Sequence, residues 1–148
     1  MAPRQLQLQM DRLARGEEWV PPPGAVNMIG FRPVAMEVGR AVIELVPDER
    51  HVTPRDPNAV FGGYLACIAD VAISFAYATT LEEGDSSVTL DLKIDFLRSA
   101  RRGVALHAEG CLRKGGKTTG FATCEIKDAD GHLVAYATGT CLRIVPRR

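Results

Sequence analysis

The sequence predicts one α+β domain in which a long buried helix is wrapped by a curved antiparallel sheet of five to six strands. Residues 63–81 contain no proline and are apolar on nearly every side, which is typical of a buried helix. Residues 88–96 alternate apolar and polar side chains, which is typical of a strand with one buried face. Further strand patterns flank the helix on both sides, and a sheet with one apolar face needs such a helix to cover it.

The first 27 residues are expected to lie outside this domain, which would span residues 28–148. Residues 4–15 have apolar side chains near helical spacing, and Gly16 ends the pattern. Residues 19–27 are interpreted as a linker, because three consecutive prolines cannot carry a regular hydrogen-bond ladder. Strand patterns follow over residues 29–39 and 42–46, with a turn at Gly39.

The part of the chain after the helix is predicted to be all strand. The alternation over residues 88–96 places five apolar side chains on one face: Val88, Leu90, Leu92, Ile94 and Phe96. Three more strands are predicted over residues 103–112, 119–127 and 132–145, joined by turns that contain Gly or Asp. The expected order is two strands, the helix, and then four strands in an antiparallel meander.

Charge and composition exclude several classes of function. Eighteen basic and eighteen acidic residues give a formal net charge of zero, so no global field would hold nucleic acid or an anionic membrane. The longest apolar run, residues 64–78, is short for a bilayer span and has Asp70 at its middle. The four cysteines lie in apolar stretches without CxxC spacing, so we expect buried thiols rather than a zinc site or disulfides, and no secretory signal precedes them. We expect a cytoplasmic protein that binds no metal, nucleic acid or membrane.

Asp70 is the anomaly of the sequence, because it places a carboxylate in the middle of the apolar helix. A buried carboxylate must be partnered, neutralised or exposed to a solvent-lined cleft. It is therefore either a catalytic group or a structural Asp bonded to nearby polar atoms. Ser74 shares its helix face at i+4 and could bond the carboxylate or a water beside it, although an ordinary helix serine bonds its own backbone.

The glycines at the start of the predicted helix form a second candidate site. The amides of Gly62 and Gly63 belong to the unpaired donors of the first turn, where the helix dipole favours negative charge. They could stabilise a carbonyl oxygen that becomes negative, or they could simply shape a turn. No metal-binding histidine spacing, no GxSxG elbow and no phosphate-binding glycine loop is present.

Residues 61–70, FGGYLACIAD, resemble the His-Gly-Gly…Asp block of the hotdog thioesterases of the phenylacetate-pathway (PaaI) type. Residues 88–98, VTLDLKIDFLR, are similar to the third strand of that family, and residues 114–118 and 130–131 resemble its later hairpins. The resemblance covers about residues 28–145, and it implies the hotdog fold and hydrolysis of an acyl-coenzyme A thioester. Coenzyme A is then part of the substrate, and no cofactor is expected.

The resemblance also implies roles for individual residues. Asp70 would be the nucleophile or general base, and an amide at Gly62 or Gly63 would polarise the thioester carbonyl. Hydroxyls of Ser74 and Thr89 would help to place the water. The family builds its site across a dimer interface, so the expected unit is a homodimer, with a dimer of dimers (a homotetramer) left open. At about 1.5 Å rise per residue, Gly62 and Asp70 of one chain are about two helical turns apart, which agrees with a shared site.

Two residues depart from the family pattern, and both lie near the expected substrate site. Phe61 replaces the motif histidine, and the usual asparagine six positions earlier is Arg55, so that Asn58 is the nearest amide that could replace it. With no net positive charge, the coenzyme phosphates need a local cluster of cations. The candidates are Arg113, Lys114 and Lys117, or Arg101 and Arg102, although either set could be an ordinary solvated turn.

Three functions are therefore compared. The leading one is acyl-CoA thioester hydrolysis by Asp70. A non-catalytic acyl-CoA binding or sensing domain is the alternative that the loop substitutions would allow. A hotdog dehydratase or hydratase ranks last, because it needs a histidine that the motif lacks.

Overall fold

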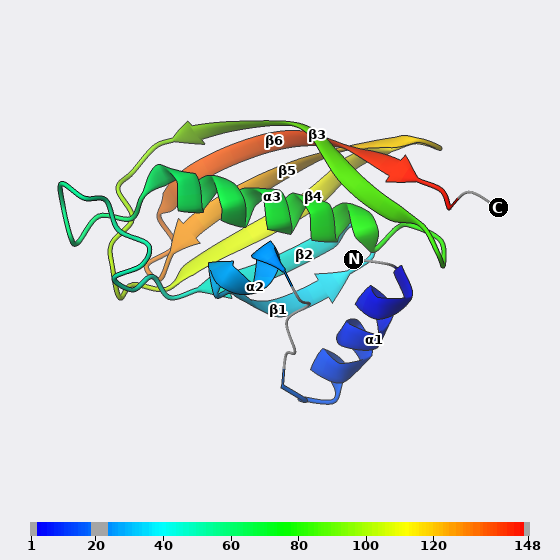
Figure 1. Cartoon of the computed structure of the whole chain (residues 1–148), viewed down its shortest axis with the longest axis horizontal. Coiled ribbons are helices and arrows are strands. Elements are labelled where there is room, and N and C mark those ends of the chain that lie inside the picture. The colour runs from blue at the N-terminus through cyan, green and yellow to red at the C-terminus, as the bar shows by residue number, and fades with distance from the viewer. Residues whose placement is uncertain (1–2, 19–23, 147–148) are drawn as a thin grey trace.

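The computed structural model describes residues 3–18 and 24–146, and it confirms the hotdog architecture. Figure 1 shows the sheet curving around one long helix, α3. The helices are α1 (Pro3–Ala14), α2 (Ala25–Ile29) and α3 (Gly62–Ala78). The six strands are β1 (Arg32–Glu37), β2 (Arg40–Leu45), β3 (Ser86–Phe96), β4 (Leu106–Gly115), β5 (Thr119–Asp128) and β6 (Leu133–Ile144), in the sheet order β1-β2-β4-β5-β6-β3.

The segment before β1 differs from the prediction. Residues 25–29, which were expected to end a linker and begin a strand, form the short helix α2. Gly30 ends this helix with a φ of 75°, a left-handed conformation that glycine adopts without strain. The strand therefore starts only at Arg32. The prolines of the predicted linker lie outside the described residues.

The predicted four-strand meander is wrong about β3. The meander consists of β4, β5 and β6, whereas β3 pairs with β6 at the far edge of the sheet. The chain leaves α3, forms this edge strand and then crosses to the middle of the sheet, where β4 pairs with β2. Sequence order alone suggested that consecutive strands would be neighbours, which is only a majority tendency. As a result β3 has one unpaired edge within this chain.

The predicted alternation along β3 is also wrong at its first half. The pairing between β3 and β6 shifts register between Thr89 and Asp91, so Leu90 is the extra residue of a β-bulge. Thr89 pairs with Cys141 and Leu92 pairs with Gly139, so both lie on the face that β6 turns toward α3. The bulge therefore turns Thr89, rather than Val88, toward the helix.

The helix lies close to the sheet because small residues face each other. A Cβ atom at Gly110 of β4 would stand 2.1 Å from the carbonyl oxygen of Ala72, so only glycine permits this approach. Ala69, Ala72 and Ala76 are fully buried at the same interface. None of the helices in the described part of the chain is both long and apolar enough to cross a bilayer.

Candidate functional site

Asp70 projects from the middle of α3 toward β3, where Thr89 meets it. The Thr89 hydroxyl donates to Asp70 Oδ1 at 2.7 Å, and the Ser74 hydroxyl lies 3.3 Å from Thr89 Oγ1. The predicted cluster of Asp70, Ser74 and Thr89 is thus brought together, but Ser74 bonds Thr89 rather than the carboxylate. Because Thr89 has only one hydroxyl proton and gives it to Asp70, Ser74 is the donor in the second bond.

A cavity of about 380 Å³ opens beside Asp70. Its lining combines small and apolar side chains with two carboxylates: Ala66, Cys67, Asp70, Thr89, Leu90, Asp91 and Leu92. Asp70 is half-buried, and no described residue donates to its Oδ2 atom. One carboxylate oxygen is therefore held by Thr89, and the other has no recorded partner at the wall of a mostly apolar cavity.

The expected burial of the cysteines holds for only part of the set. Cys124 and Cys141 are buried, but Cys67 is exposed and lines the Asp70 cavity. It lies on the same stripe of α3 as Asp70 and Ser74, but those two are half-buried against Thr89 of β3, whereas no described residue of its own chain covers Cys67. The apolar-all-round pattern of the helix predicted burial there, and a single chain does not provide it.

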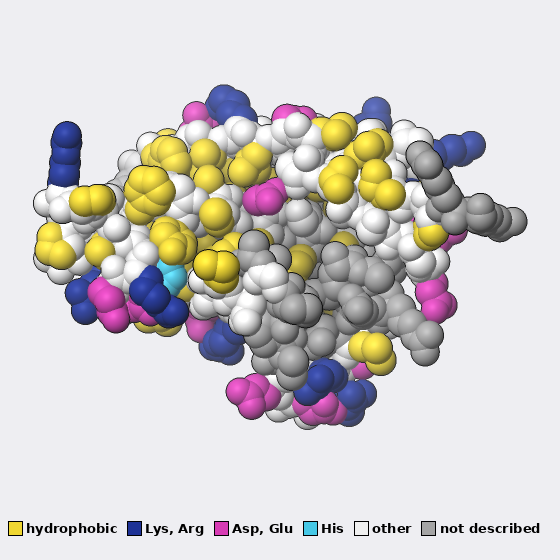
Figure 2. All heavy atoms as spheres, in the orientation of Figure 1, with side chains coloured by type: hydrophobic (Ala, Val, Ile, Leu, Met, Phe, Trp, Pro, Cys, Tyr) yellow, Lys and Arg dark blue, Asp and Glu magenta, His cyan; other side chains and the backbone are white. Residues whose placement is uncertain are grey.

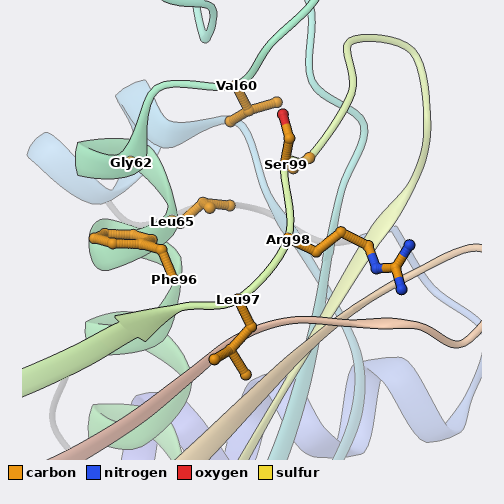
Figure 3. Close-up of a pocket in the computed structure, with 8 residues that line it drawn as sticks. Val60, Gly62, Leu65, Phe96, Leu97, Arg98 and Ser99 are labelled. Carbon is orange, nitrogen blue, oxygen red and sulfur yellow. The ribbon is translucent and has the colours of Figure 1, made fainter.

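A second cavity of about 380 Å³ lies at the first turn of α3. Figure 3 shows Gly62 and Leu65 on the helix side, with Phe96 beside the first turn and residues 97–99 along the opposite wall. Sequence reasoning did not single out Arg98, which is exposed here and has no ion-pair partner among the described residues. The feature that points to Arg98 is its position just after β3, whose last residue, Phe96, packs against Gly62 in the first turn of α3.

The amides of the first turn have no side-chain cap. Phe61 occupies the N-cap position, and its side chain offers no hydrogen-bond acceptor. Two aromatic rings instead pack on the glycines, since a Cβ at Gly62 would stand 3.2 Å from Phe96 Cζ and one at Gly63 would stand 2.3 Å from Phe61 Cε1. The Tyr64 N–H donates to the Phe61 carbonyl at 2.9 Å, whereas the N–H groups of Gly62 and Gly63 have no recorded acceptor among the described residues and could donate to a ligand oxygen.

These two candidate groups belong to different cavities of the same chain. Gly62 and Asp70 are eight residues apart on α3, so their backbone positions are separated by about 12 Å along the helix axis. Neither cavity contains residues from both groups. One chain therefore does not bring its own Gly62 amide and Asp70 carboxylate to the same atom.

The other predicted binding residues lie away from both cavities. Arg55 and Asn58 are exposed on the loop before α3, where the Asn58 amide N–H donates to Asp56 Oδ1 at 2.9 Å and its side chain has no recorded partner. Arg113, Lys114 and Lys117 belong to the β4–β5 hairpin, at the opposite end of the sheet from the first turn of α3 (Figure 1). Arg113 Nε donates to Thr123 Oγ1 at 2.8 Å. The roles of all five stay predictions.

The histidines and the acidic turn have structural explanations. The His51 ring is buried, accepts from the Asp48 amide at 3.0 Å and lies edge-on to Tyr64. Neither His51, His107 nor His132 lines the Asp70 or Gly62 cavity. Among the described residues, one group has the geometry for a metal ion, namely Asp128, Asp130 and His132, and there Asp128 accepts two backbone amides of its own turn.

Comparison with known proteins identifies the family. The model of the thioesterase superfamily matches residues 58–135. A candidate esterase of Saccharolobus solfataricus is 35% identical over 114 residues, which is 77% of this chain and 79% of the relative. The acyl-coenzyme A thioesterase PaaI of Escherichia coli is 32% identical over 116 residues, which is 78% of this chain and 79% of the relative.

Solved structures agree with this result. The structure of E. coli PaaI superposes with a TM-score of 0.78 at 24% identity, covering 97% of this chain and 96% of the other. A Streptococcus mutans protein solved with acetyl CoA bound superposes with a TM-score of 0.72 at 24% identity, covering 80% of this chain and 92% of the other. The chain therefore belongs to the thioesterase superfamily and has the fold of the PaaI-type thioester hydrolases that its motif resembles.

Proposed function

We propose that this protein hydrolyses acyl-CoA thioesters to the free acid and coenzyme A. The observation that carries the proposal is the state of Asp70, a half-buried carboxylate that Thr89 holds by one oxygen at the wall of an open cavity. Its Oδ2 atom has no recorded partner among the described residues, which leaves that oxygen accessible to a water or a substrate. A carboxylate with one oxygen unpaired suits a base or nucleophile.

The chemistry needs two groups on opposite sides of the thioester carbonyl. Asp70 either takes a proton from a water that attacks the carbonyl carbon, or attacks that carbon itself to form an anhydride that water then cleaves. In both routes the carbonyl oxygen becomes negative, and an uncapped amide at the start of α3 would stabilise it. Coenzyme A leaves as the thiolate and takes up a proton.

These two groups meet in the proposal only across a homodimer. The edge strand β3 carries exposed apolar side chains, with Leu90 56% and Phe96 54% exposed. Figure 2 shows exposed hydrophobic side chains gathered over α3 and along β3 on one face of the molecule. A second copy that pairs its β3 with this edge would cover that surface. A two-fold axis would place Gly62 of the partner subunit beside Asp70.

Coenzyme A carries phosphate groups, and Arg98 is the cation that would bind them. Arg98 lines the Gly62 cavity without a recorded ion-pair partner, whereas Arg101 lies 3.5 Å from Asp56 and Arg102 lies 3.7 Å from Glu49. An unpaired guanidinium keeps its donors for a phosphate. The acetyl CoA bound to the S. mutans protein supports the ligand class for this fold.

A panel of acyl-CoA substrates tests the proposal, with release of the coenzyme A thiol as the readout. We expect turnover with at least one acyl group, and a fall of about 100-fold or more in kcat for Asp70→Asn, which keeps the shape of the side chain and its acceptor for Thr89. Asp91→Asn is the matched control, since it removes the other carboxylate of the same cavity. Binding of acyl-CoA without turnover of any member would favour the binding or sensing domain.

A further inference from the structure

His51 is a buried polar side chain that the proposed mechanism does not use. It lies in the loop between β2 and α3 and is 1% exposed. Its Nε2 atom lies 3.2 Å from the carbonyl oxygen of Ile29, which can only accept, so Nε2 carries a proton and donates the hydrogen bond. Its Nδ1 atom lies 3.0 Å from both the amide nitrogen and Oδ1 of Asp48, so Asp48 binds this nitrogen in either protonation state. The ring is therefore fixed between the last residue of α2 and its own loop.

The same residue contacts the start of α3 at two points. Its backbone carbonyl accepts the Phe61 N–H at 2.7 Å, and Phe61 is the N-cap of the helix. Its ring meets the ring of Tyr64 edge-on, with the centroids 4.6 Å apart, and Tyr64 lies in the first turn. The two points of contact therefore flank Gly62 and Gly63 along the chain.

The glycine pair itself has little that would fix its orientation. Glycine has no side chain to pack and a wide choice of backbone angles, and the N-cap makes no side-chain hydrogen bond. The rings of Phe61 and Phe96, which pack on the pair, are each about half exposed. An amide that stabilises a developing charge must point at one place, since a misplacement of about 1 Å can lower a rate about 100-fold. The direction of the Gly62 N–H therefore depends on the residues that hold the turn.

We propose that His51 is a positioning residue that holds the first turn of α3 and so directs the Gly62 N–H at the thioester carbonyl. It acts through its bond to Phe61 and its contact with Tyr64, because it lines neither the Gly62 cavity nor the Asp70 cavity. The buried ring ties the turn to α2, which itself packs against α3. This inference rests on the proposed function of the Gly62 amide, and one of its tests does not need activity.

Two variants each break one of these links. His51→Phe keeps a ring of similar size beside Tyr64 but loses both nitrogen bonds, so the Ile29 carbonyl and the Asp48 N–H lose this partner. His51→Gln keeps an N–H donor for Ile29 but removes the ring from Tyr64. Positioning by the whole side chain requires that both variants disturb the first turn.

Thr79→Val is the matched control at the other end of α3. The Thr79 hydroxyl accepts the Gly39 N–H and donates to the Ala76 carbonyl, each at 2.7 Å. This substitution also removes two hydrogen bonds of a partly buried side chain, so it should lower the melting temperature by roughly 2 to 6 °C, as the His51 variants should. It does not touch the first turn, so it separates lost stability from lost positioning.

The kinetic test measures kcat and KM for acyl-CoA. We expect each His51 variant to lower kcat about 5- to 20-fold with KM unchanged, and Thr79→Val to keep kcat within about 2-fold of the original protein. In a Gly62→Pro background, which lacks the N–H, the His51 variants should have no further effect on kcat. A folded His51 variant with the original kcat, a loss that persists in full in the Gly62→Pro background, or an equal loss in Thr79→Val would each overturn the proposal.

Nuclear magnetic resonance relaxation provides the test without substrate. The order parameters of the Gly62 and Gly63 N–H groups should be about 0.85 in the original protein and in Thr79→Val, and should fall below about 0.7 in both His51 variants. Equal order parameters in all four proteins would contradict a positioning role. Absence of turnover in the original protein would instead refute the proposed function and leave this measurement to decide whether His51 holds the first turn.

Discussion

Replacing Gly62 with proline removes one N–H group from the first turn of α3 and almost nothing else. Gly62 is the first residue of the helix, where a backbone N–H has no partner within the helix and proline is well tolerated. The residue before a proline must be extended, and Phe61 already has φ −66° and ψ 129°. The variant should therefore fold like the original protein and should still be able to form the proposed dimer.

The expected effect of the lost amide follows from its proposed role as the donor to the carbonyl oxygen. Loss of one such donor lowers kcat about 100- to 1,000-fold, or about 2.7 to 4 kcal/mol of transition-state stabilisation. The new side chain itself is a smaller disturbance, because its Cβ would lie 3.2 Å from the ring of Phe96, which is half exposed and can move. Gly62→Ala adds the same Cβ and keeps the N–H, so we expect it to lower kcat less than about 5-fold.

The assay compares kcat and KM of both variants on the best acyl-CoA, with circular dichroism melting as the check on folding. The difference in kcat between Gly62→Pro and Gly62→Ala measures the contribution of the Gly62 amide, because both variants add the same Cβ and only proline removes the N–H. If Gly62→Pro and Gly62→Ala have the same kcat while both melt like the original protein, the Gly62 amide does not contact the carbonyl oxygen.

Three further predictions concern the shared site and its two cavities. Mixing Asp70→Asn with Gly62→Pro chains under subunit exchange should restore about a quarter of the original activity, since half of the dimers are mixed and each has one intact site; proven exchange without recovery would place the site within one chain. Arg98→Ala should raise KM for acyl-CoA about 5- to 10-fold, less at high salt, without affecting a thioester that lacks the nucleotide; equal effects on both substrates would exclude a phosphate contact. A maleimide should label Cys67 and inactivate the enzyme, with acyl-CoA slowing both events; labelling without inactivation would show that the Asp70 cavity is not the acyl site.

The sequence predicted the buried helix and the position of its acid because both are strong local signals. Nineteen residues without proline and with an apolar character on every side specify a buried helix, and one carboxylate among them is conspicuous. The apolar and polar pattern alone did not predict which strand borders the acid, because the sheet order depends on contacts far apart in the chain. The edge position of β3 became known only from its pairing with β6.

The bulge at Leu90 shows a different limit of pattern analysis. The alternation rule assumes that successive side chains point to opposite faces of the sheet without interruption. One extra residue therefore moves every side chain before it to the face opposite the predicted one. Val88 was predicted to point toward the helix, yet it is 49% exposed, while Thr89 reaches Asp70. The family resemblance indicated Thr89 correctly as a residue of the cluster, although the alternation placed it on the opposite face.

The proposed homodimer would explain two observations together: the apolar residues that one chain leaves exposed, and the separation of the two groups proposed to be catalytic. In the proposed homodimer Leu90 and Phe96 would be buried, which would explain why they read as core residues although they are exposed on the edge of β3 in one chain. The same edge lies between the Asp70 cavity, which Leu90 lines, and the Gly62 cavity, which Phe96 lines. A partner that covers these side chains would necessarily contact both cavities. The surface that drives association would then also be the surface on which acid and amide are brought together, so loss of the dimer and loss of activity should always occur together.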